Sequence, residues 1–269
     1  VKWTNAFSYS RVNDPDFRET RISVTDGDTN LNTGNGSGID RFWRNLNEIN
    51  ESARLDIKIP LNEKIDLKTG GAGTLKWREF DVQNYKITTT NISDIQFDPD
   101  WFLQKENIWS ADPASPNYTK GTFAIGSFQP ANSFSARQNV YSGYLMLQHP
   151  VLKVVKLIYG VRVEQTAMYY TGENNTGSKK YDDEQTLDAT NVLPSINAVV
   201  ALSEKANLRA AATKTVARPS FKEKSIAQIY DPITKRTFVG NLNLQQTNIN
   251  NYDLRWEYFL SPKELISVA

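Results

Sequence analysis

The sequence contains no cysteine and a single histidine. Without cysteine there are no disulfide bonds and no thiolate metal sites, and the redox compartment stays undetermined. The formal net charge is only +1. Because phosphate binding needs a clustered basic surface, we expect no nucleic-acid partner. The chain also lacks any run of about 18 apolar residues, the length that a membrane helix needs.

What the sequence does contain is a repeated alternation of apolar and polar residues. From Tyr252 to Leu260 every second side chain is apolar, while Asp253, Arg255 and Glu257 point the other way. This pattern is typical of a strand with one face in hydrocarbon and the other in water. Similar runs occupy residues 53–61, 157–163, 192–202 and 208–212. Since only alternate residues of such strands face lipid, the mean hydropathy of -0.53 does not exclude a membrane.

Short and long connections alternate between these runs. We predict tight turns at Asn62 to Lys64, His149 to Val151, Ser203 to Lys205 and Ser261 to Glu264. We predict long polar loops at Asn13 to Asp40, Thr88 to Asn139, Thr171 to Thr190 and Ala217 to Thr247. Short periplasmic turns and long extracellular loops are the asymmetry of bacterial outer-membrane barrels.

The expected fold is therefore all-β: a segment of an antiparallel transmembrane β-barrel with about nine strands. The first residues already have the pattern of mid-strand, and Ala269 lies inside another apolar run. An unclosed set of strands leaves two edges that lipid does not tolerate, so we expect further strands outside this sequence.

Several motifs resemble the barrel region of TonB-dependent receptors, particularly those of Bacteroidetes-type bacteria. The strongest runs from Ala212 to Glu223 and contains the phrase "T.ARP.F.E"; residues 239–244 and 251–258 follow it with a "GN..L" loop and a "N.DL..E.Y" strand. Residues 16–19, 144–145, 159–164 and 191–195 are also similar to this family. The resemblance covers nearly the whole chain.

The resemblance implies a 22-stranded barrel in the outer membrane of a Gram-negative cell, plugged by an N-terminal domain and energised by TonB. Residues 1–269 would be part of that barrel domain, without the plug, the TonB box or the C-terminal closing strand. The implied partners are membrane lipid, the plug and the TonB complex, with a surface lipoprotein as a further potential partner. The implied ligand is small and scarce, such as a siderophore, haem, cobalamin, an oligosaccharide or a peptide.

Charged residues that alternate with the apolar positions are expected to line the lumen. They are Arg54, Asp56, Arg162, Glu164, Arg209, Asp253, Arg255 and Glu257. They are candidates for ligand contact. The alternative is that they pair with one another and with the plug, because lumen walls are polar whatever the cargo.

Catalytic chemistry has little support, and we expect neither an enzyme nor a cofactor. The only histidine, His149, lies in a predicted turn, which is a poor place for a triad. The acidic run Asp182 to Glu184 is expected to be a solvated loop surface, with calcium or a cationic cargo as the alternative.

Two glycine-containing stretches and one acidic stretch also invite a binding interpretation. Asp26, Asp28, Asn30 and Asn32 are spaced like calcium ligands, but the glycine and the glutamate of a calcium loop are absent. Gly34, Gly36 and Gly38 are not followed by the lysine and serine of a phosphate loop, which favours an ordinary outer loop. Gly70, Gly71 and Gly73 interrupt a strand, where we expect a bend or bulge.

Three functional hypotheses remain open. The first is a barrel fragment of a TonB-dependent receptor. The second is another outer-membrane barrel, such as a passive porin or an adhesin. The third is a soluble β-rich module that binds glycans, which predicts that the outward aromatic side chains are buried against a second sheet.

Overall fold

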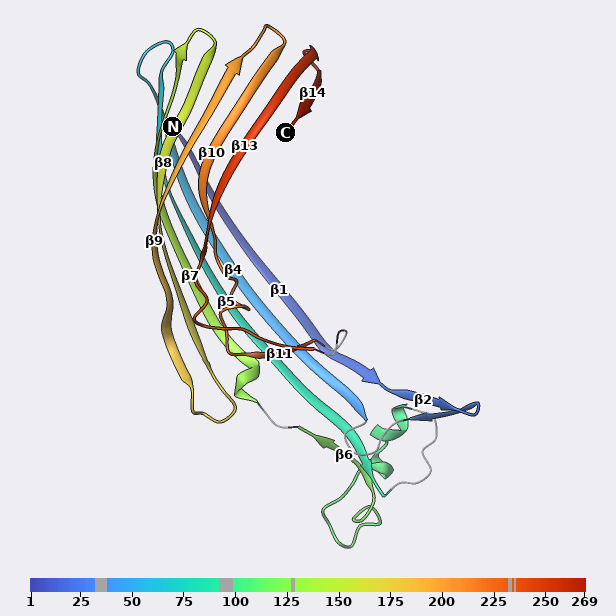
Figure 1. Cartoon of the computed structure of the whole chain (residues 1–269). Helices are drawn as coiled ribbons and strands as arrows, with labels where there is room; N and C mark the ends of the chain where they lie inside the picture. The colour runs from blue at the N-terminus through green and yellow to red at the C-terminus, as the bar shows by residue number, and fades with distance from the viewer. Residues whose placement is uncertain (32–37, 92–98, 127–128, 232–233, 235) are drawn as a thin grey trace.

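The computed structural model describes residues 1–31, 38–91, 99–126, 129–231, 234 and 236–269. Its main element is an antiparallel sheet whose path runs β1-β4-β5-β7-β8-β9-β10-β13-β14, with β6 added beside β5. The sheet is curved like part of a barrel wall and is open at β1 and β14 (Figure 1). The strands of the sheet are β1 (Lys2–Thr20), β4 (Ile39–Pro60), β5 (Asp66–Thr90), β6 (Gly121–Ile125), β7 (Ser133–Leu152), β8 (Val155–Glu173), β9 (Lys180–Ala201), β10 (Ala206–Ala217), β13 (Thr247–Ser261) and β14 (Glu264–Val268).

Smaller elements lie between these strands. Two hairpins are formed by β2 (Ile22–Thr25) with β3 (Asp28–Leu31) and by β11 (Gln228–Asp231) with β12 (Arg236–Val239). Three short 3-10 helices are η1 (Pro99–Leu103), η2 (Lys105–Asn107) and η3 (Pro130–Asn132). Among the described residues, no helix has both the length and the apolar character needed to cross a bilayer.

The fold class expected from the sequence, an antiparallel barrel segment with about nine strands, is confirmed. The short turns gather at one end of the sheet, and β2, β6 and the long connections lie at the other (Figure 1). β5 has 25 residues, whereas about 10 suffice to cross a membrane. The strands therefore project well beyond the bilayer on the side of the long connections.

Three of the four predicted turns are confirmed, and the one at His149 is wrong. β4 and β5, β9 and β10, and β13 and β14 are each joined at the expected place. β7 instead continues through His149 to Leu152, and the turn is formed by Lys153 and Val154. Pro150 stays in the ladder opposite Lys156, and the register shifts just after it. The proline therefore marks an irregular strand end and not the turn itself.

Two of the predicted loops are largely strand. Between Thr171 and Thr190 the chain forms the paired ends of β8 and β9, and the loop is confined to residues 174–179. Between Asn13 and Asp40, β1 continues to Thr20 and is followed by the β2–β3 hairpin. Above the membrane both faces of a strand meet water, so the apolar alternation stops although backbone pairing continues. The connections at 88–139 and 217–247 do carry long irregular stretches.

One face of the sheet exposes rows of large apolar side chains, as a lipid-facing surface does. Trp3 on β1 is 72% exposed, Tyr141 on β7 is 53% exposed and Tyr252 on β13 is 80% exposed. We call this the outer face. No second sheet covers these side chains among the described residues, which contradicts the hypothesis of a soluble module.

The glycines of β5 produce no bulge, which was one of the two irregularities expected there. Gly70, Gly71 and Gly73 stay in unbroken register with β4 and with β7. Gly70 instead makes room for a neighbour: a Cβ added there would lie 2.8 Å from the Tyr144 ring and 2.3 Å from the Leu55 carbonyl oxygen.

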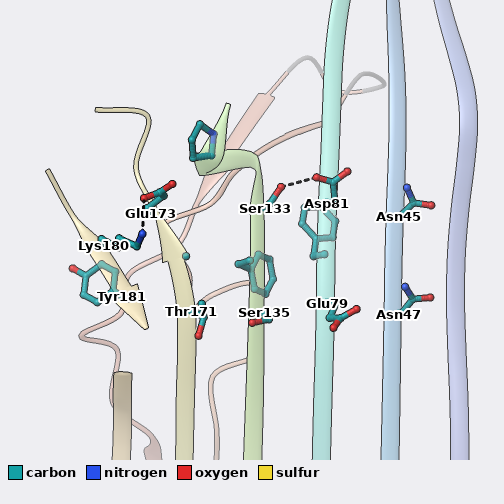
Figure 2. A pocket seen from close by; sticks show the side chains of 14 residues that line it. Asn45, Asn47, Glu79, Asp81, Ser133, Ser135, Thr171, Glu173, Lys180 and Tyr181 are labelled. Carbon is teal, nitrogen blue, oxygen red and sulfur yellow. Dashed lines mark hydrogen bonds and ion pairs between the residues drawn. The ribbon is translucent and has the colours of Figure 1, made fainter. Parts of the chain in front are cut away.

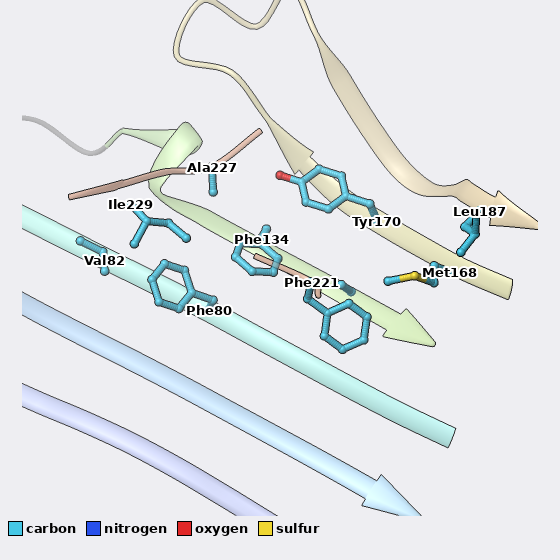
Figure 3. Close-up of a cluster of buried hydrophobic side chains, with 10 residues drawn as sticks. Phe80, Val82, Phe134, Met168, Tyr170, Leu187, Phe221, Ala227 and Ile229 are labelled. Carbon is cyan, nitrogen blue, oxygen red and sulfur yellow. The ribbon is translucent and has the colours of Figure 1, made fainter. Parts of the chain in front are cut away.

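The opposite, inner face holds the main buried core (Figure 3). Phe80, Phe134 and Tyr170 form a row across β5, β7 and β8, with ring centroids 5.4 and 5.8 Å apart. Ala227 and Ile229, from the connection between β10 and β13, pack on this row. The chain after β10 therefore folds back against the wall instead of projecting outward.

Candidate functional site

The strand register places all eight predicted lumen residues on the inner face. Asp56 lies in the row that continues through Gly70 and Tyr144 to Arg162, and Arg54 lies in the next row, which also contains Glu164. Opposite-strand partners share a face in an antiparallel sheet. Arg209 is opposite Arg255, and the rows beside it hold Asp253 and Glu257. The inner position follows from the register, and ligand contact by these residues stays a prediction.

The Asp56 carboxylate accepts hydrogen bonds from Arg54 and from Tyr144 on the inner face. Nε of Arg54 donates to both carboxylate oxygens, at 3.0 and 2.8 Å. The Tyr144 hydroxyl donates to Oδ1 of Asp56 at 2.6 Å. The tyrosine side chain starts on β7 and crosses β5 to reach β4, which is possible because Gly70 lies between them.

Glu164 is buried and joins the wall to the segment after β10. Arg162, two residues before it on β8, donates to Oε1, and Arg218 donates to Oε2. Nε of Arg218 also donates to Oγ1 of Thr166 at 2.9 Å. Glu164 is 8% exposed. Two guanidinium groups thus compensate one buried carboxylate, as burial of a charge requires.

Glu257 is a second buried carboxylate of the inner face, at 5% exposure. Nε of Arg209 donates to Oε2 at 2.7 Å, and Nε of Arg255 lies 3.3 Å from Oε1. Arg255 also donates to the Ser267 hydroxyl on β14 at 3.1 Å. Asp253 is exposed on the same face. Seven of the eight predicted residues therefore pair with charges, which is the alternative role considered above.

A hollow of about 450 Å³ lies on the inner face near the short turns. We call it the inner hollow; its lining includes Arg54, Asp56, Lys68, Tyr144 and Arg162. Its described lining holds three cationic side chains and one carboxylate. Such a surface favours an anionic group, because arginine and lysine supply charge and hydrogen-bond donors together.

The connection between β10 and β13 is clamped to the inner face at both ends. We call the described part of residues 218–246 the inner segment. Arg218 holds its start on β8, and the amide groups of Gln246 and Asn191 hydrogen-bond reciprocally at its end, one bond measuring 3.1 Å. Between these clamps the segment supplies Phe221, Ala227 and Ile229 to the buried core.

The start of the inner segment is a capped turn. Ser220 Oγ accepts from the Glu223 backbone N–H at 3.3 Å, and Glu223 Oε2 accepts from the Ser220 N–H at 2.7 Å. This reciprocal pair is a capping box. The hydrogen bond from the Ser220 backbone N–H is the main cause that lowers the pKa of the Glu223 carboxyl.

Two sequence motifs, residues 217–223 and 240–244, pack against each other within this segment. The Lys224 ammonium, 2% exposed, donates to the backbone oxygens of Leu242 and Leu244. Burial lowers the pKa of Lys224. A Cβ added to Gly240 would lie 2.4 Å from the Glu223 carbonyl oxygen. The "ARPSFKE" and "GNLNL" stretches are thus two sides of one structural unit.

The structure adds residues that the sequence did not single out as part of a site. Tyr144, Arg218 and Asn191 occupy junctions on the inner face. Arg218 belongs to the "T.ARP.F.E" motif, and this motif is the sequence signal that could have pointed to its role. Tyr144 and Asn191 also lie in segments that resemble the family, but their partners could not be found from the sequence because these lie on other strands or in the inner segment.

The loop hypotheses have mixed outcomes. The acidic run at 182–184 lies in β9 and not in a loop, and Asp183 accepts from Arg137 at 2.9 and 2.6 Å. Asp26 and Gly27 form the turn of the β2–β3 hairpin, both with positive φ. Asn32, Gly34 and Gly36 lie outside the described residues. Within the described part of the chain, no group of three or more histidine or acidic side chains could hold a metal ion.

Comparison with known proteins decides the family. The sequence model of the outer membrane protein beta-barrel family matches residues 114–268, more than half of the chain. The chain belongs to the outer membrane protein beta-barrel family. This membership assigns the exposed apolar rows to the lipid and the protein to the outer membrane.

The match extends from before β6 into β14 and includes the inner segment. No curated protein matches the chain. Among solved structures, the copper transporter OprC aligns with 97% of this chain at 12% identity and a TM-score of 0.31. The chain spans 42% of the length of that structure.

Proposed function

We propose that the chain is part of an outer-membrane receptor of the TonB-dependent type, which binds a scarce extracellular ligand and imports it with energy from the inner membrane. The observation that carries this proposal is the inner segment, clamped against the wall by Arg218 and Gln246. Two of the motifs that resemble TonB-dependent receptors contribute to this segment, through residues 218–223 and 239–244.

The inner segment argues against a passive pore. A porin keeps a water-filled lumen, and solutes pass without any rearrangement of the protein. Here the segment covers part of the wall with a buried core that includes Tyr170, 1% exposed, and Phe221, 5% exposed. A covered wall suits a barrel whose lumen is occupied and whose passage is opened at an energetic cost.

The inner hollow supports a role in binding anionic groups. Its excess of cations would attract either an anionic ligand or acidic side chains of a plug. The ligand itself is left open among siderophores, haem, cobalamin, oligosaccharides and peptides. We propose binding and transport for this chain and no catalysis.

The test uses the full-length parent gene in its own organism. Uptake of each labelled ligand is measured in the wild type, in a gene deletion and in the complemented strain, with and without a protonophore. The proposal expects one ligand class whose uptake needs both the gene and the proton gradient. Uptake that needs the gene but ignores the protonophore would indicate a passive porin. Unchanged uptake with reduced surface attachment would indicate an adhesin.

A further inference from the structure

The outer face carries a hollow of about 430 Å³ just beyond the apolar rows, and its lining combines polar side chains with a larger apolar surface (Figure 2). We call it the outer hollow. Its floor is formed by outward side chains of β4, β5, β7 and β8 that lie opposite one another in two rows. The first row contains Asn45, Asp81 and Ser133, and the second contains Asn47, Glu79, Ser135 and Thr171.

The rim of the outer hollow is built by elements that rise beyond the sheet. Its lining includes Pro130 of η3 and the Glu173 and Lys180 pair at the end of the β8–β9 hairpin. The Asn175 side chain accepts from the Ala131 backbone N–H at 3.1 Å and so ties these two elements together. The volume lies within the range of small-molecule sites.

The position of the outer hollow follows from the outward residues of β5. Leu75 and Trp77 end the apolar part of this strand, and Glu79 and Asp81 follow at the next two outward positions. At about 3.4 Å per residue, Glu79 lies roughly 7 Å along the strand beyond Trp77. The headgroup layer of a bilayer is about 5–7 Å thick on each side. The outer hollow therefore begins at headgroup depth and rises above it.

The chemistry of the hollow suits hydroxyl groups. Its floor offers amides, hydroxyls and carboxylates, all of which form hydrogen bonds with neutral polar ligands. Asp81 already accepts from Ser133 at 2.6 Å, whereas Glu79 is exposed. The described lining holds three carboxylates and one ammonium, so anionic groups such as phosphate are disfavoured.

We propose that the outer hollow binds the uncharged saccharide portion of a glycolipid of the outer leaflet. The continuity of the hollow with the lipid-facing rows selects a membrane glycolipid over a free extracellular sugar. The site lies on the face opposite to the inner hollow, so the inference requires only the outer-membrane location and is independent of import.

The test measures glycolipid that copurifies with the full-length protein from its own outer membrane in mild detergent. EDTA is present throughout, so that bridging divalent cations do not contribute. The triple variant Asn47→Ala, Glu79→Ala, Ser135→Ala removes three groups from the floor. Each lost hydrogen bond should weaken binding about fivefold, so the triple variant should lose nearly all bound glycolipid.

The matched control is Asn248→Ala with Asn250→Ala, exposed residues that lie just beyond Tyr252 on the same face of β13 but outside the hollow. It should retain glycolipid at the wild-type ratio. Should the triple variant fail to fold, as judged by its yield in the outer membrane, Glu79→Gln alone tests the carboxylate and should reduce retention about fivefold. Wild-type retention in the floor variants, equal loss in the control, or retention of a free sugar without its lipid would overturn the proposal.

Discussion

Tyr144 and Asp56 are joined by a 2.6 Å hydrogen bond that spans an entire strand, because the tyrosine reaches from β7 over β5 to β4. The intervening residue, Gly70, has no side chain to block it. Because Gly70 leaves room for the tyrosine ring, a hydrogen bond on the inner face connects β4 with β7 across β5. The contact also positions the Asp56 carboxylate beside Arg54, at the edge of the inner hollow.

Removing the Tyr144 hydroxyl should lower the stability of the sheet modestly. Tyr144→Phe keeps the ring over Gly70 but leaves Asp56 with one partner fewer, and we expect a loss of about 1 kcal/mol in the free energy of unfolding. Urea titration of the full-length protein in lipid vesicles measures it. Tyr141→Phe, on the outer face of the same strand, is the control and should change stability little. Equal effects of the two variants would contradict a role for the Asp56 contact.

Gly240 should tolerate no side chain. In Gly240→Ala the new Cβ meets backbone oxygens of Lys222, Glu223 and Ser225 within 2.7 Å, so the two halves of the inner segment must separate. We expect protease cleavage within residues 218–246 that the wild type resists. Gly71→Ala, whose nearest neighbour would be 3.4 Å away, should remain resistant. Equal protease resistance of the two variants would show that residues 217–223 and 240–244 do not pack together.

Glu164 should be the most sensitive position of the inner wall. Glu164→Gln removes the charge that compensates Arg162 and Arg218, and breaking a buried ion pair costs about 3–5 kcal/mol. Hydrogen exchange of the inner segment should accelerate along with global unfolding. Glu204→Gln, in the exposed turn between β9 and β10, is the control with the same chemical change. A stable Glu164→Gln variant with a protected segment would mean that Arg218 is not the clamp.

Acid should loosen the start of the inner segment. The pKa of Glu223 is lowered in the folded protein by its hydrogen bonds to Ser220. Its contribution is therefore present above the ordinary glutamate pKa, about 4.3, and is lost as the pH falls through the lowered folded value. Hydrogen exchange at residues 221–227 should rise on acidification in the wild type. Glu223→Gln should remove this pH dependence, and a variant that retains it would assign the effect to another group.

A charge on the lipid face should be far more harmful than a change on the inner face. Leu254→Arg places a guanidinium in hydrocarbon and should cost about 2–4 kcal/mol at the bilayer midplane. Asp253→Asn, the adjacent residue on the opposite face, should change stability little. Folding yield into vesicles and urea titration compare the two. Similar stability of both variants would mean that the two faces do not lie in different solvents.

The sequence by itself determined the strands and their faces. The alternation from Tyr252 to Leu260 assigns each side chain to lipid or to the inner face, because successive residues of a strand point to opposite sides. The same pattern placed all eight charged candidates on one face. It failed where strands leave the membrane: β8 continues to Glu173 and β9 begins at Lys180, although water on both sides removes the alternation there.

Only the tertiary structure decided what covers the inner face. The polar composition of residues 217–247 suggested an outward loop, yet the Ser220 turn, Phe221 and Lys224 fold back onto the wall. The Ser220 turn is local, but Phe221 packs with residues of other strands and Lys224 donates to Leu242 and Leu244, 18 and 20 residues later, so no local pattern could reveal the fold-back. The Tyr144 contact with Asp56 depends in the same way on strand register, which places residues 88 positions apart side by side.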